Sequence, residues 1–292
     1  MTGGFALLGS HLGDPERKIL TAPQIRTLTQ RMQEMEISDP DRSLSIEDLQ
    51  QLGYGPEMAE RILRLLEDGA WLTQYLQEGQ RQHCRLITRE DPDYPALLRK
   101  RLGGESPCCL FCKGDVSLLQ QPGIALVGSR ELQPFNRDFA REVGRQAADH
   151  DLVLISGNAR GADREAQNAC LEAGGRVISI VADSLQEKTP HPRILYVSLE
   201  DYDAPFSAQR ALSRNRVIHA LGYMTFVAQC SLETGGTWSG TTQNLREGWS
   251  LVICCRDGSP AAQALQNQGA YLMDRQELNH LTDFQPSQLS FL

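Results

Sequence analysis

The chain has 292 residues, of which 40% are hydrophobic and 23% are charged, and its formal net charge at pH 7 is −8. This composition is that of an ordinary globular protein with room for two domains. The acidic balance excludes a protein held on nucleic acid by its overall charge, so any polyanion site has to be built locally. No apolar run reaches the roughly 18 residues of a membrane span and no secretory signal is visible, so we expect a cytoplasmic protein without membrane contact.

Residues 1–80 are predicted to form a small all-helical domain. Apolar side chains recur at spacings of three and four in three segments, at 15–36, 45–68 and 69–79. The second segment contains Gly53-Tyr54-Gly55, which resembles the turn of a helix-hairpin-helix that presents backbone N–H groups to a DNA phosphate. Few basic residues lie nearby, so we favour the plainer interpretation of two packed helices joined by a glycine turn.

Residues 81–117 are interpreted as a connector of short elements, with a strand-like stretch at 84–88 and turn-forming residues after it. Cys109 and Cys112 have the C-x-x-C spacing of a zinc site. No second Cys/His pair follows at zinc-ribbon spacing, so we expect no metal and mostly buried, reduced thiols.

Residues 118–275 change to a different pattern, in which short apolar runs alternate with helical segments. The runs lie at 123–130, 152–157, 176–182, 194–199, 223–230 and 250–255. Such an alternation is typical of a parallel sheet covered by helices on both faces. We therefore predict an α/β fold, a Rossmann-like domain preceded by the helical domain, and we interpret residues 276–292 as a tail too short for another domain.

Glycine, hydroxyl and arginine residues gather where these strands are predicted to end. Ligands of open parallel sheets bind beyond the carboxyl ends of the strands. Glycines allow a ligand to approach the backbone closely, and a guanidinium group can donate two parallel hydrogen bonds to phosphate oxygens. The candidate phosphate-binding residues are Gly128, Ser129, Arg130, Ser156, Gly157, Arg160, Gly161, Asp163, Arg214, Asn215, Arg216, Gly235, Gly236 and Thr237.

The same turns lack the signatures of the usual nucleotide sites and of catalysis. Neither G-x-G-x-x-G nor a P-loop motif follows the first strand, and no nucleophile–base pair is readable, so we expect a binding protein without catalytic residues or cofactor. Asp163 is expected to compensate the dipole of the following helix or to hold Arg160. Asn215 is expected to cap its helix or to contact ligand, and Arg214 and Arg216, two residues apart, should point in different directions.

Residues 91–274 resemble the DprA/Smf family of DNA-processing proteins. The resemblance rests on "DPDYPALL" with "LFCKG", on "VGSR", on "SGNARGAD", on "RNRVIHAL" and on "GGTWSGTTQNLREG". It implies a homodimeric, Rossmann-like protein that binds single-stranded DNA and helps to load a RecA-type recombinase. It also implies a phosphate-binding rim formed by Arg130, Ser156, Gly157, Arg160, Gly161, Arg214 and Arg216.

The chain departs from the family pattern at several positions. Ala211-Leu212 replace the usual Phe-Pro, so a base-stacking aromatic has to come from elsewhere, and Phe206, Tyr202 and Trp238 are the candidates. Gln229 stands where the family has glutamate and Gln167 where it has histidine, and we expect no C-terminal winged helix because nothing long enough for one follows residue 275.

Two other functions stay open at this stage. The "TGGTWSGTTQN" turn is similar to that of the lonely-guy phosphoribohydrolases, which suggests a nucleotide sensor or a nucleotide-processing protein, for example in phage or plasmid defence. Gln243 and Asn244 are uncharged where that motif has its glutamate, which disfavours hydrolysis. The acidic charge alternatively suits a protein-interaction module in which the helical domain docks a partner.

Overall fold

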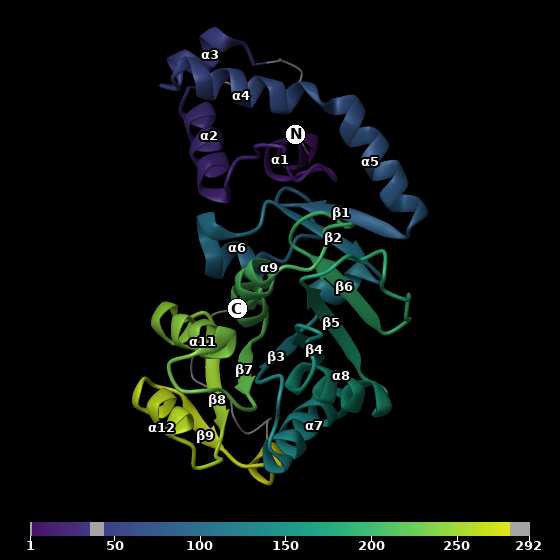
Figure 1. Cartoon of the computed structure of the whole chain (residues 1–292), viewed down its shortest axis with the longest axis vertical. Coiled ribbons are helices and arrows are strands. Elements are labelled where there is room, and N and C mark those ends of the chain that lie inside the picture. The colour runs from purple at the N-terminus through teal and green to yellow at the C-terminus, as the bar shows by residue number, and fades with distance from the viewer. Residues whose placement is uncertain (1, 36–43, 281–292) are drawn as a thin grey trace.

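The computed structural model describes residues 2–35 and 44–280, and a nine-stranded sheet lies at its centre (Figure 1). The strand order is β1-β2-β6-β5-β4-β3-β7-β8-β9; pairing is parallel from β6 to β9 and antiparallel at β1-β2 and β2-β6. The strands are β1 Cys84–Thr88, β2 Cys109–Lys113, β3 Gly123–Val127, β4 Val153–Ser156, β5 Arg176–Val181, β6 Ile194–Ser198, β7 Met224–Val227, β8 Leu251–Cys255 and β9 Tyr271–Met273.

Helices cover both faces of the sheet, which confirms the predicted α/β, Rossmann-like class. Alternate residues of β3 enter different cores: Ile124 packs with Phe139 of α7 on one face, and Ala125 lies with Val217 of α10 on the other. The helices that follow the helical domain are α6 Ala96–Leu102, α7 Pro134–Asp149, α8 Ala162–Glu172, α9 Ala208–Ser213, α10 Asn215–Leu221, α11 Gly235–Glu247 and α12 Pro260–Asn267.

The segment interpreted as a connector, 81–117, is part of the sheet. Its strands β1 and β2 pair with each other, and β2 pairs with β6, where Phe111 faces Ser198. Every residue of β2 is buried, because one side of the strand packs on the sheet core and the other on the helical domain. The sheet therefore begins well before residue 118.

The helical domain forms its own core around Ile25, Leu49 and Ile62 and docks on the β1-β2 end of the sheet (Figure 1). At this junction the ring of Tyr75 lies 4.6 Å from that of Tyr202. Its helices are α1 Thr2–Gly9, α2 Ala22–Glu34, α3 Ile46–Gln51, α4 Pro56–Glu67 and α5 Gly69–Arg81.

Two boundaries in the helical domain differ from prediction. Helix α1 was not expected, and α2 begins at Ala22 rather than near residue 15 because Thr21 forms a capping box with Gln24. The predicted end of that helix at residue 36, and residues 281–292 of the tail, lie outside the described residues. Within the described ranges, no helix is both long and apolar enough to span a membrane.

Candidate functional site

The first two glycine turns lie side by side at the carboxyl edge of the sheet. A Cβ on Gly128 would lie 2.5 Å from Cβ of Ala162, so only glycine lets these turns approach. Gly161 has φ +87°, and its own Cβ would lie 2.6 Å from the carbonyl carbon of Arg130. The backbone N–H of Ala162 donates to the carbonyl of Ser129 at 3.1 Å. We call residues 128–130 together with residues 160–161 the arginine rim.

The arginine rim carries two solvent-facing cations. Arg130 is exposed, and the side chain of Arg160 is 72% exposed. Arg160 donates to Glu131 at 3.0 Å, and Glu131 is itself 86% exposed. An ion pair so open to water is weak, so it leaves Arg160 able to exchange this partner for a phosphate.

Arg214, expected on the rim surface, is instead buried beneath it. Its side chain is 7% exposed and lies 3.8 Å from the carboxylate of Asp163. The guanidinium occupies the space that a Cβ on Gly157 would fill. Burial lowers the pKa of Arg214, and burial raises the pKa of Asp163 although the Arg214 charge opposes that rise. Arg214 therefore supports the loop from below rather than facing solvent.

Asp163 holds the turn that precedes α8. Its carboxylate accepts the backbone N–H of Ala159 at 3.1 Å and pairs with Arg214. Since Arg160 pairs with Glu131, the expectation that Asp163 holds Arg160 is wrong. The buried carboxylate at the first turn of α8 fits the other expectation, compensation of the helix dipole.

Ser156 also turns inward, contrary to its predicted place on the rim. It is fully buried, and its hydroxyl accepts a hydrogen bond of 2.6 Å from Nε2 of Gln167. The same Gln167 amide reaches the hydroxyl of Ser179 at 3.4 Å. Gln167, at the position of the family histidine, thus ties α8 to β4 and β5, and the Ser156 hydroxyl is used inside the fold.

The remaining candidates surround the starts of α10 and α11. Arg216 points away from Arg214, as the two-residue spacing predicts, and reaches Glu105 at 3.4 Å. Asn215 does not cap α10; its amide donates to the carbonyl of Gly236 at 3.0 Å and joins the two helices. Gly235 and Thr237 lie with Gly236 in the first turn of α11, after the carboxyl end of β7.

Asn244 and His219 form a buried polar network behind this helix pair. Asn244, fully buried in α11, lies with its amide 3.2 Å from Nδ1 of His219 and donates to Ser250 at 2.9 Å. Burial lowers the pKa of His219 to about 3. Asn244 therefore holds α11 against neighbouring elements, in the region where the phosphoribohydrolase motif carries a glutamate.

The cysteine pair of β2 is not arranged for metal binding. Residues three apart on a strand point to opposite faces, and Cys109 enters the core shared with the helical domain while Cys112 enters the sheet core. Burial raises the pKa of Cys112 to about 12. Among the described residues, no three His, Cys, Asp or Glu side chains cluster as a metal site.

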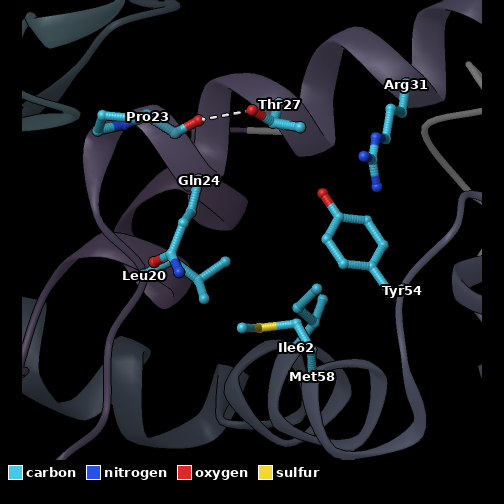
Figure 2. A pocket seen from close by; sticks show the side chains of 8 residues that line it. All are labelled: Leu20, Pro23, Gln24, Thr27, Arg31, Tyr54, Met58 and Ile62. Carbon is cyan, nitrogen blue, oxygen red and sulfur yellow. Dashed lines mark hydrogen bonds between the residues drawn. The ribbon is translucent and has the colours of Figure 1, made fainter.

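The glycine turn of the helical domain has little to offer a phosphate. The N–H groups of Gly53 and Tyr54 donate to the carbonyls of Gln50 and Leu49 at 2.9 and 3.0 Å. Figure 2 shows Tyr54 between α2 and α4, at a cavity of 240 Å³, and the Arg31 guanidinium lies 5.0 Å from its ring. The contacts fit the plainer interpretation, a turn between packed helices.

Sequence reasoning missed two residues that support the arginine rim or the buried Arg214 beneath it. Gln229, which follows β7, accepts the N–H of Ser129 through its carbonyl at 2.8 Å and that of Gln133 through its side chain at 2.9 Å. Asp183, which follows β5, lies close enough to act on the charge of Arg214. Their places near the carboxyl ends of predicted strands were the available signal, because all carboxyl ends of parallel strands meet at one edge.

Comparison with known sequences places the chain among DNA-processing proteins. A profile of the family described as DNA recombination-mediator protein A matches residues 85–281. Protein Smf of Escherichia coli is 27% identical over 78% of this chain and 64% of its own length. Protein Smf of Synechocystis is 25% identical over 72% of this chain. The chain spans only 55% of that relative.

Solved structures show the same fold. DprA from Streptococcus pneumoniae superimposes with a TM-score of 0.73 over 91% of this chain and 94% of its own, at 24% identity. DprA from Helicobacter pylori, studied for its single-stranded DNA binding mode, gives a TM-score of 0.58 over 69% of this chain and 98% of its own, at 23% identity. With the family profile covering most of its length, the chain belongs to the DprA/Smf family of DNA recombination-mediator proteins.

Proposed function

We propose that this protein binds single-stranded DNA along the arginine rim and acts in DNA processing, as a homodimer that delivers the strand to a RecA-type recombinase. The recombinase and the dimer are proposed from family membership. Binding of single strands is a property described for the Helicobacter pylori relative. For this chain it is supported by the rim itself.

The observation that carries the proposal is the pair of exposed cations, Arg130 and Arg160, on two turns that Gly128 and Gly161 allow to pack closely together. Two exposed guanidinium groups on adjoining turns suit the phosphates of a flexible strand. Because the net charge is −8, the overall charge does not attract DNA, and we expect the affinity to depend on local features such as this one.

We also propose that the protein acts by binding rather than by catalysis. The hydroxyl of Ser129 accepts the N–H of Glu131 at 3.3 Å and has no basic partner among the described residues. His219, the histidine beside Asn215, is fully buried and is too weak a base to activate a nucleophile at neutral pH.

The test is the affinity for a fluorescent thymidine oligonucleotide, measured by anisotropy at several salt concentrations. Arg130→Ala should weaken binding roughly tenfold or more, the effect of losing one charged hydrogen-bonding partner. The plot of log K against log salt should also become less steep by about 0.7, because one phosphate contact is lost.

Arg81→Ala is the matched control, since this α5 side chain is 73% exposed and its removal changes the net charge equally. It should leave affinity unchanged. Equal losses in both variants, or no binding by the folded wild type, would refute the proposal. A thermal shift with mononucleotides but none with oligonucleotides would favour the nucleotide-sensor alternative instead.

A further inference from the structure

A cavity of 480 Å³ opens beside the arginine rim, at the carboxyl ends of β3, β7 and β8. It lies within the range of small-molecule pockets, roughly 300–1,000 Å³. Its walls come from three separate segments: Gln133 and Phe135 before and within α7, Gln229 after β7, and Asp257 after β8. No residue predicted to bind phosphate lines it.

Phe135 gives this cavity an unpartnered aromatic surface. It is the second residue of α7, and 48% of it is exposed. A phenylalanine so open to water leaves apolar area that a flat ligand can cover. Nucleobases stack on such rings with little regard to sequence.

The polar groups of the cavity are held in place from behind. The amide of Asn136 is buried and donates at 2.7 Å both to the carbonyl of Ala228 and to the carboxylate of Asp257. The side-chain oxygen of Gln229 accepts the N–H of Gln133 at 2.9 Å. This leaves Nε2 of Gln229 as a donor with no partner among the described residues, and Asp257 offers an acceptor.

Two wall residues of the cavity connect it to the arginine rim. The carbonyl of Gln229 accepts the N–H of Ser129, the residue next to Arg130. Gln133, another wall residue, follows Arg130 in the loop between β3 and α7, so a phosphate at Arg130 would lie on a loop that also forms the cavity wall. A stacking ring, a donor and an acceptor next to a phosphate position are what one nucleotide unit requires.

We propose that this cavity, which we call the base pocket, receives a single nucleobase of the bound DNA strand, stacked on Phe135 with its edge toward Gln229 and Asp257. The proposal rests on the proposed function, because it takes the strand to lie on the arginine rim.

The test compares two fluorescent oligonucleotides of equal length and charge, one of thymidines and one of abasic units. The measured quantity is the ratio of their affinities at one salt concentration. The wild type should favour the thymidine strand by roughly 5- to 150-fold, the range for one stacked base. Phe135→Ala should bring the ratio close to one, and Phe135→Trp should keep it.

Phe206→Ala is the matched control, because Phe206 is similarly exposed, at 58%, and does not line the base pocket. It should leave the ratio unchanged. Equal wild-type affinity for both strands, or a ratio that depends on Phe206 rather than Phe135, overturns the base pocket while the proposed function stands. Failure of both strands to bind overturns the proposed function and the base pocket with it.

Discussion

Gly157→Ala should destabilise the fold through one displaced side chain. The added methyl would occupy the position of the Arg214 guanidinium. The backbone of Gly157 has no positive φ, so alanine is not strained there. The guanidinium must therefore leave its buried site beside Asp163, since the three atoms nearest to the added methyl all belong to Arg214.

The size of the loss follows from the pair that is broken. At 3.8 Å and an effective dielectric constant of about 20, the attraction between Arg214 and Asp163 is about 4 kcal/mol. Breaking a buried pair typically costs about 3–5 kcal/mol, and overpacking about 1–3 kcal/mol. These two costs describe the same displacement and are not added. Because the displaced Arg214 side chain regains hydration in solvent, we expect the free energy of unfolding to fall by about 3 kcal/mol.

Urea unfolding measured by tryptophan fluorescence provides the assay, since Trp238 and Trp249 report on the sheet domain. If Arg214 is the obstacle, the double variant Gly157→Ala/Arg214→Ala should be no less stable than Arg214→Ala alone. Gly69→Ala is the control, because its methyl meets no atom within 4 Å. Additive losses in the double variant, or a Gly157→Ala protein as stable as the wild type, would refute the reasoning.

Two further predictions use the same urea assay. Gln167→Leu should lower the free energy of unfolding by about 1–3 kcal/mol, because it leaves the buried Ser156 hydroxyl without its donor; an unchanged midpoint would contradict this. Because burial lowers the pKa of His219 to about 3, the folded state binds its proton more weakly than the unfolded state, whose value is about 6.5. The free energy of unfolding should therefore be highest above about pH 6.5 and should fall toward pH 3 by up to about 1.4 kcal/mol per pH unit. His219→Gln should make this fall with pH less steep. Equal pH dependence in the wild type and the variant would show that His219 does not titrate in this way.

The parallel part of the sheet could be read from the sequence because its strands are buried on both faces. Runs such as 123–130 and 152–157 contain little besides apolar residues and end in glycine turns. Their order predicts that the turns meet at one edge, where the structure places them. The pairing of β2 with β6 could not be read, because it joins residues far apart in the chain and reverses direction.

The orientation of individual side chains was the part of the site that sequence could not supply. Arg130 and Arg214 both lie in motifs that were predicted to bind phosphate. Arg130 is exposed, whereas Arg214 is buried under Gly157. The difference depends on α10 packing against β3, a tertiary contact that motif spacing does not encode. Ser156 likewise turns inward because Gln167, on α8, supplies a donor.

The structure also decides among the aromatic residues that replace the family phenylalanine. Tyr202 is 3% exposed and stacks on Tyr75 at the domain junction, so it is unavailable to a base. Trp238 packs against the sheet core. Of the three sequence candidates Phe206 is the most exposed, at 58%, and Phe135, which the motifs did not indicate, is 48% exposed. Because Phe135 lines a cavity that contains hydrogen-bonding groups, we expect it to take part in base recognition on the β7 and β8 side of the rim.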